Sequence, residues 1–145
     1  MARRRGLVVI LATEPKTAAG LGADGCHLSE VALRRQAGKR RRPWPGFLIT
    51  AATHGPSALN KAALLGCDAA LLSPIFPTLS HPDAQTLGPL KTRLWVRRVG
   101  FPLPVFALGG LRPATAKRLG RQALSGFAAT EPFEGKGLRK SVPHR

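Results

Sequence analysis

The sequence has few of the residues that build covalent or metal-held frameworks. It contains two cysteines, no tyrosine and only seven aspartates and glutamates among 145 residues. Two cysteines are too few for the disulfide framework of a small secreted protein. The four histidines are scattered and the two cysteines lie far apart, so they show no recognisable zinc-binding spacing. We predict that Cys26 and Cys67, on or beside predicted strands, are buried thiols of a cytoplasmic protein.

The sequence also lacks any apolar run near the ~20 residues of a membrane-spanning helix, so we expect no membrane partner. Residues 1–13 begin with basic residues and continue into an apolar segment, as a signal peptide does. The apolar part, 7–12, is shorter than usual, and charged residues with a proline follow it in place of a clear cleavage site. We interpret 7–12 as a first strand, buried on both faces.

Positive charge, by contrast, is abundant. The chain has 23 Lys and Arg against 7 Asp and Glu, which gives a net charge of +16. Such a surface attracts phosphates, nucleic acids and anionic membranes, and does not by itself identify a partner. The basic runs 3–5, 34–35 and 39–42 could follow a nucleic-acid backbone, with Trp44 stacking on a base. No nucleic-acid-binding motif accompanies them, so we favour a solvated surface and regard a nucleic-acid partner as the weaker hypothesis.

Apolar runs alternate with helical patterns along the chain, which predicts a parallel sheet with right-handed crossovers. A Gly or Ser-Gly turn precedes a short strand three times, in LGADGCHL, LGCDAALL and ALSGFA. A βα unit repeated around a barrel would produce this repeated sequence pattern. A Rossmann-type sheet would too, but no G-x-G-x-x-G motif follows the first strand. The predicted strands are 7–12, 26–28, 47–51, 69–72, 104–108 and 124–129. The predicted helices are 17–21, 30–37, 56–65, 90–99 and 112–119, with Leu90, Leu94 and Trp95 on one apolar face of the fourth.

The most distinctive stretch is 71–88, LLSPIFPTLSHPDAQTLG. An apolar strand leads into a loop with three prolines that carries Thr78, Ser80 and His81. Prolines restrict such a loop, so its polar side chains need less ordering when a ligand binds. A rigid surface turn would have the same composition. The position after a strand favours a catalytic loop at the carboxyl end of a barrel strand.

Two further positions follow predicted strands and so belong to the same edge of the sheet. Gly109 and Gly110 could let backbone N–H groups approach a phosphate, although a tight turn also explains two glycines. His54 could act as a general acid or base, or could cap the start of the next helix. Ala129 and Thr130 end the last predicted strand, where barrels often complete a phosphate site.

These motifs, in the order LGADGCHLSE, ATH, GCDAALLSPIFPTLSHPDAQTLG and PVFALGGL, resemble the thiamine-phosphate synthase and TenI-type thiazole tautomerase family. The resemblance covers residues 7 to about 133. It implies a TIM barrel, (β/α)8, in which residues 1–133 supply six βα units, the family's strands three to eight. We expect residues 134–145 to be a basic tail. The family's synthase joins a pyrimidine diphosphate to a thiazole phosphate with Mg²⁺, and its tautomerase isomerises the thiazole phosphate.

The resemblance assigns roles to the residues identified above. His54 falls on the tautomerase histidine that transfers a proton, and His81 stands where the synthase usually has lysine; both are candidate catalytic residues. The candidates for binding the phosphorylated substrate are Thr78, Ser80, Gly109, Gly110, Ala129 and Thr130. The positions of the Mg²⁺ ligands hold Thr13 and Ala32, so we expect no bound metal or other cofactor.

The resemblance also implies that the family's first two βα units are missing from this sequence. Six strands of an eight-stranded barrel leave two open edges, which expose unpaired backbone groups. We therefore expect either that the sequence is a fragment of a longer protein or that a partner or second copy completes the barrel. The favoured function is binding of a thiazole phosphate or similar small phosphate, with metal-free proton transfer by His54. The alternative is a non-catalytic remnant of the barrel.

Overall fold

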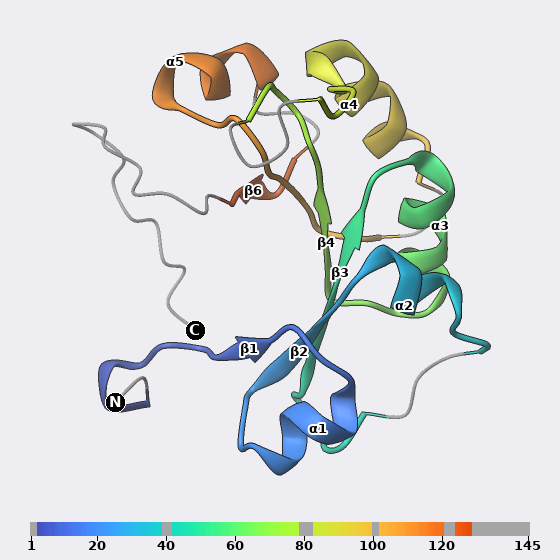
Figure 1. Ribbon diagram of the computed structural model, residues 1–145, viewed down its shortest axis with the longest axis vertical. Coiled ribbons are helices and arrows are strands. Elements are labelled where there is room, and N and C mark those ends of the chain that lie inside the picture. The colour runs from blue at the N-terminus through green and yellow to red at the C-terminus, as the bar shows by residue number, and fades with distance from the viewer. Residues whose placement is uncertain (1–2, 39–41, 79–82, 100–101, 121–123, 129–145) are drawn as a thin grey trace.

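The computed structural model describes residues 3–38, 42–78, 83–99, 102–120 and 124–128 (Figure 1). Strands and helices alternate throughout. The strands are β1 (Ile10–Leu11), β2 (Gly25–Leu28), β3 (Leu48–Thr53), β4 (Ala69–Leu72), β5 (Val105–Ala107) and β6 (Gly126–Phe127). The α-helices are α1 (Pro15–Gly20), α2 (Glu30–Arg34), α3 (Pro56–Leu64), α4 (Gly88–Arg97) and α5 (Pro113–Ala116). Two 3-10 turns, η1 (Arg3–Arg5) and η2 (Lys117–Leu119), complete the described elements.

The six strands form one parallel sheet in the order β1-β2-β3-β4-β5-β6. The prediction of a parallel α/β sheet is therefore confirmed, and its strands lie in chain order as the strands of a barrel do. Among the described residues β1 and β6 do not pair with each other, so the sheet is open. Figure 1 shows the helices arranged along the outside of the sheet in chain order.

The two faces of the sheet differ in burial. In the central strands β3 and β4, Ile49, Ala51, Ala70 and Leu72 alternate with less buried neighbours and are themselves at most 3% exposed. These residues belong to the same two apolar clusters as buried side chains of α1, α2 and α3. The helices therefore cover this face of the central strands. The alternate residues, including Leu48, Leu71 and Phe106, are only half-buried, because no helix layer lies on the other face of the described sheet.

The prediction of a first strand buried on both faces is wrong. The strand is limited to β1, and Leu7, Val8 and Ile10 are 58%, 62% and 37% exposed. Within the described residues β1 has a neighbour only on one side, β2. An apolar run at the edge of an open sheet has nothing to pack against on its free side, whatever its composition.

The apolar face predicted for the fourth helix is also wrong. In α4, Leu90 and Leu94 are 79% and 43% exposed, whereas Thr92 is fully buried. The stripe that packs on the core follows the spacing i, i+3, i+4, i+7, with Thr92, Trp95, Val96 and Val99. This stripe carries the larger apolar area, so packing selects it over the leucines. The Thr92 hydroxyl donates to the Gly88 carbonyl at 2.7 Å, which makes its burial tolerable.

The repeated LG-x-D sequence has a shared structural role. Gly22 and Gly66 follow α1 and α3 with φ of +71° and +70°, a conformation that glycine adopts without strain. Two residues later, the carboxylates of Asp24 and Asp68 accept hydrogen bonds from the backbone N–H groups of Val9 and Ile49, at 2.8 and 2.7 Å. Each aspartate therefore links the start of its own strand to the start of the preceding one.

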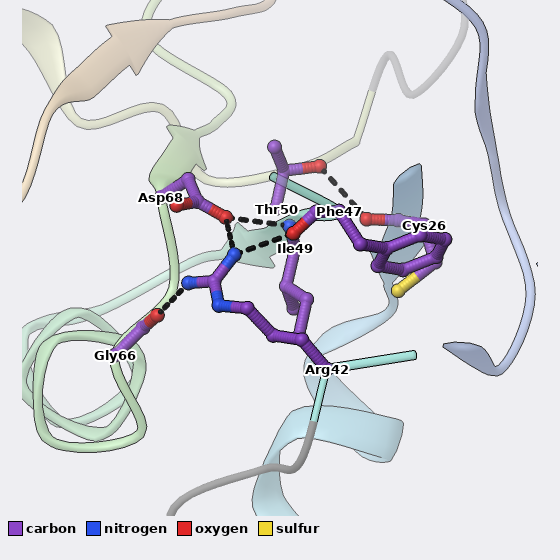
Figure 2. Close-up of polar contacts among 7 residues, drawn as sticks. All are labelled: Cys26, Arg42, Phe47, Ile49, Thr50, Gly66 and Asp68. Carbon is purple, nitrogen blue, oxygen red and sulfur yellow. Dashed lines mark hydrogen bonds and ion pairs between the residues drawn. The ribbon is translucent and has the colours of Figure 1, made fainter. Parts of the chain in front are cut away.

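Arg42 strengthens the second of these links, as Figure 2 shows. Its guanidinium donates to the Asp68 carboxylate at 2.6 Å and to the carbonyl oxygens of Phe47 and Gly66. The hydrogen bond to Asp68 is the main reason that the pKa of Arg42 is raised above its usual value. All these partners lie at or before the amino ends of β3 and β4. This is the end of a parallel α/β sheet where conserved polar groups usually serve stability.

Cys26 and Cys67 are buried as reduced thiols, as predicted. His27, on β2, is hydrogen-bonded to the neighbouring strand. Its Nδ1 lies 2.9 Å from the Thr50 hydroxyl on the neighbouring strand, where the two residues are in register. Partial burial lowers the pKa of His27 because it disfavours the charged imidazolium.

Candidate functional site

The carboxyl ends of the strands bring together segments that are far apart in the sequence. His54 directly follows β3, the segment beginning at Ser73 follows β4, and Gly109 and Gly110 follow β5 by one residue. Glu30 lies one residue after β2, at the start of α2. Because all strands are parallel, these positions share one edge of the sheet, opposite the Arg42 network.

The imidazole of His54 is held in a defined orientation. Its Nδ1 lies 2.8 Å from the main-chain carbonyl oxygen of Ser73, at the end of the neighbouring strand. A carbonyl oxygen can only accept a hydrogen bond, so Nδ1 carries the proton in this arrangement. The neutral ring then has its lone pair on Nε2. Since His54 is exposed, this arrangement makes it a base that solvent or a ligand can reach.

The backbone of His54 is anchored by Glu30, a residue that sequence reasoning missed. The Glu30 carboxylate accepts a hydrogen bond from the His54 N–H at 2.6 Å and pairs through its other oxygen with Arg34 at 2.6 Å. Its side chain is only 15% exposed. In the sequence, a glutamate after a capping serine indicates only a favourable helix start. Ser29 caps α2, since its hydroxyl accepts a hydrogen bond from the Ala32 N–H. The predicted capping role of His54 itself is not seen, because Gly55 precedes α3.

The glycine pair allows two loops to approach closely. Gly109 and Gly110 have φ of +93° and +61°. A Cβ on Gly110 would lie 2.8 Å from the carbonyl carbon of Phe76, and one on Gly109 would lie 3.0 Å from the Cα of Pro74. The Gly109 carbonyl accepts a hydrogen bond from the Phe76 N–H at 3.1 Å. Close packing of the two loops therefore explains why both residues are glycine, as in the tight-turn interpretation given above.

The same turn leaves donors available. Within the part of the chain that the structure describes, no group accepts a hydrogen bond from the N–H of Gly109 or of Gly110. Two adjacent N–H groups that lack acceptors can bind an anion. Because both residues are glycines, no side chain hinders the approach of the anion. The tight turn and the phosphate site are therefore compatible interpretations of these glycines. Close packing of the two loops involves the glycine Cα atoms and the Gly109 carbonyl, whereas an anion would bind to the N–H groups.

The remaining predicted site residues are placed only in part. Thr78 is half-buried in the loop that begins at Ser73 and lies at the same edge of the sheet. Ser80, His81, Ala129 and Thr130 lie outside the described residues.

A Mg²⁺ site of the kind implied by the resemblance does not fit the residues present. Thr13 follows β1, and Ala32 lies on α2; neither offers a carboxylate. Glu30, two residues before Ala32 in the chain, is already engaged by the His54 N–H and by Arg34. In the described ranges, no three His, Cys, Asp or Glu side chains come together as metal ligands.

Comparison with known proteins shows which family the chain belongs to. Residues 1–133 match the family model described as thiamine monophosphate synthase. The chain belongs to this family. A protein of Aquifex aeolicus that carries the name thiamine-phosphate synthase 2 is 36% identical over 111 residues, which are 77% of this chain and 58% of that protein. A thiamine-phosphate synthase of Thermus thermophilus is 32% identical over 77% of this chain and 52% of its own.

The fold is similar to that of a solved structure. A thiamine phosphate pyrophosphorylase from Pyrococcus furiosus superposes with a TM-score of 0.66 and 22% identity, over 93% of this chain and 63% of that one. The chain thus spans between about half and two thirds of the length of these relatives. No helix among the described residues is long and apolar enough to cross a membrane.

Proposed function

We propose that the carboxyl edge of the sheet binds a small phosphorylated substrate of thiamine biosynthesis, a thiazole phosphate or a close analogue. The relatives named above carry the names of thiamine-phosphate synthases. The observation that carries the proposal is the pair of N–H groups at Gly109 and Gly110, which have no acceptor within the described part of the chain. A phosphate supplies several strong acceptors for such donors. We propose Thr78 and, beyond the described residues, Ser80, Ala129 and Thr130 as further ligands.

We further propose that His54 transfers a proton on the bound thiazole phosphate. Nε2 removes a proton from one position of the substrate and returns it at another, so the enzyme is unchanged after each turnover. The imidazolium formed in between keeps its Nδ1–H bond to the Ser73 carbonyl, and this hydrogen bond strengthens when the ring is charged. We assign His81 a supporting role at the phosphate. Diphosphate displacement is less well supported, because the residues present do not fit the metal site.

Isothermal calorimetry with the thiazole phosphate tests the binding claim. We expect a saturable heat with the folded wild-type protein and a reduced heat with Thr78→Val. Absence of heat at millimolar ligand, with protein shown to be folded by circular dichroism, would refute it. An isomerase assay tests the chemistry separately. Loss of general base catalysis typically costs 10²–10⁴-fold in rate, so we expect a fall of that size in His54→Ala. Full isomerase activity of that variant would remove His54 from the mechanism.

We also propose that two further βα units, on the same polypeptide or a separate one, close the sheet into a barrel. The supporting observations are the half-buried face of Leu48, Leu71 and Phe106, and the exposure of Ile10 and Phe127 on the two edge strands, 37% and 42%. The chain can be mixed with a peptide that holds the first two βα units of the Aquifex aeolicus relative. We expect a 1:1 complex with a higher melting temperature. Cooperative melting of the chain alone, with no binding to the peptide and no change in melting temperature when it is added, would contradict this proposal.

A further inference from the structure

Helix α4 presents an apolar stripe to solvent rather than to the core. Leu90 is 79% exposed and Leu94, one turn later, is 43% exposed, while Thr92 on the opposite face is fully buried. At 3.6 residues per turn, the two leucines lie at the pole of the helix farthest from the core stripe of Thr92, Trp95, Val96 and Val99. Exposed leucines at this pole are not explained by packing within the chain.

Basic side chains flank this stripe on both sides. Arg93 and Arg97 lie on one side of the leucines, and Lys91 and Arg98 on the other; all four are exposed. Residues 84–130 contain no Asp or Glu at all. Among the described residues, none of the four cations forms an ion pair with a carboxylate. The face therefore combines two apolar side chains with four unneutralised positive charges.

Completion of the sheet would not cover this face. Helix α4 packs against α3 on one side and η2 on the other, so it lies in the middle of the helix layer. Additional βα units would join at β1 and β6, the ends of the sheet. The solvent pole of α4 would stay exposed in a closed barrel.

The lack of a membrane-spanning run led us to expect no membrane partner, but docking on a membrane surface needs no such run. We propose that the face formed by Leu90, Lys91, Arg93, Leu94, Arg97 and Arg98 docks on an anionic membrane surface. The four cations are attracted to acidic lipid headgroups, each contributing on the order of a fivefold gain in binding. The two leucines enter the boundary between headgroups and acyl chains, as apolar residues of interfacial helices do. The helix lies along the surface, and the parallel sheet remains in water.

Two other occupants fit the face less well. A second copy of the chain, related by a two-fold axis, would bring four cations against four, and juxtaposed like charges oppose association. An RNA strand would neutralise the cations but would leave the leucines without an apolar partner. RNA-binding surfaces usually offer aromatic rings for base stacking, and the one aromatic residue of α4, Trp95, lies on the core stripe.

Vesicle co-sedimentation of the full chain tests the proposal. We expect the wild-type protein to pellet with vesicles that contain phosphatidylglycerol and to remain in solution with phosphatidylcholine alone. The double variant Arg93→Gln/Arg97→Gln should bind the anionic vesicles about 30-fold more weakly, at roughly fivefold per cation. Leu90→Gln/Leu94→Gln should weaken binding by about tenfold, because apolar contact is lost while the charge is unchanged.

Matched controls separate this face from the general positive charge of the chain. Arg4→Gln/Arg5→Gln removes two exposed cations, and Leu64→Gln removes a leucine that is 54% exposed on α3. Both should bind vesicles as the wild type does. Leu90→Ala/Leu94→Ala provides a second apolar variant with high helix propensity. Circular dichroism should show that every variant melts as the wild type does.

Three outcomes would overturn the proposal. The first is no binding to anionic vesicles, or equal loss of binding in the control variants. The second is vesicle binding that is unaffected by the changes in α4, combined with loss of binding to single-stranded RNA in Arg93→Gln/Arg97→Gln. The third is a homodimer, seen by analytical ultracentrifugation, that dissociates in Leu90→Gln/Leu94→Gln.

Discussion

The Nδ1 atom of His54 lies 2.8 Å from the main-chain carbonyl oxygen of Ser73, across the junction between β3 and β4. This contact fixes which ring nitrogen carries the proton and leaves Nε2 as the basic atom. A second contact, from the His54 N–H to the Glu30 carboxylate, fixes the backbone of the same residue. The histidine is therefore oriented by residues that follow β2 and β4, the strands on either side of β3, before any ligand binds.

Removal of the Glu30 carboxylate should loosen this arrangement. We predict that Glu30→Ala lowers the free energy of unfolding by about 1–2 kcal/mol, because a hydrogen bond to a charged group is lost. If His54 is catalytic, kcat should fall with little change in KM. The matched control is Arg34→Ala, which breaks only the exposed ion pair and should cost less than about 0.5 kcal/mol. Urea unfolding measures both variants, and equal stability losses would argue against a special role for Glu30.

The close approach of two loops at Gly110 gives a steric prediction. Gly110→Ala places a Cβ 2.8 Å from the carbonyl carbon of Phe76 and also enforces a positive φ. We expect a loss of about 3 kcal/mol or more in unfolding free energy. Gly66→Ala is the control: its φ is +70° but nothing lies within 4 Å of the new Cβ, so only the roughly 1–2 kcal/mol of left-handed backbone strain applies. Similar losses in the two variants would mean that the loops can separate.

The burial of His27 gives a pH prediction with a definite sign. Its pKa is lowered in the folded protein, so the unfolded chain binds a proton more readily between the folded and unfolded pKa values. Stability from this residue is fully present above the unfolded value of about 6.5 and is lost as the pH falls below it. We predict that His27→Gln shows a weaker decline in stability between about pH 7 and pH 5 than the wild type. Urea unfolding at several pH values tests this, and parallel curves for the two proteins would disprove it.

The Arg42 network should affect stability without affecting the site. We predict that Arg42→Met costs about 1–3 kcal/mol in unfolding free energy, since Asp68 and two carbonyl oxygens lose a charged donor. Ligand binding should be unchanged, because the network lies at the opposite end of the sheet from His54. Arg35→Met, an exposed change nearby in the sequence, should be close to neutral. Loss of ligand binding in folded Arg42→Met would contradict this separation of stability from function.

Much of the fold could be predicted from local sequence signals. The central strand β4 is a continuous apolar run, and β3 is an apolar run interrupted by Thr50. Ser29, Pro56 and Gly66 mark helix ends by mechanisms that act within a few residues. The errors occurred where long-range packing decides. The exposure of Leu7 and Val8 depends on what lies beyond an edge strand, and the rotation of α4 depends on which of two apolar stripes fits the core.

The candidate site divides in the same way. His54, Gly109 and Gly110 could be identified because side-chain chemistry and glycine content are visible in the sequence. Ser73 could not, since it acts through a carbonyl group that every residue has. Glu30 could not either, because a glutamate at a helix start is ordinary and its contact with His54 joins residues 24 positions apart. Such contacts become visible only when the strands are placed side by side.

The central claim is that a small phosphate binds at the N–H groups of Gly109 and Gly110. The most direct measurement is a ¹H–¹⁵N NMR titration of the folded chain with the thiazole phosphate. The account predicts that the amide signals of Gly109 and Gly110 shift saturably, with those of the amino-end residues Asp24 and Asp68 unchanged. Saturable shifts confined to other residues, or no shift at millimolar ligand, would contradict it.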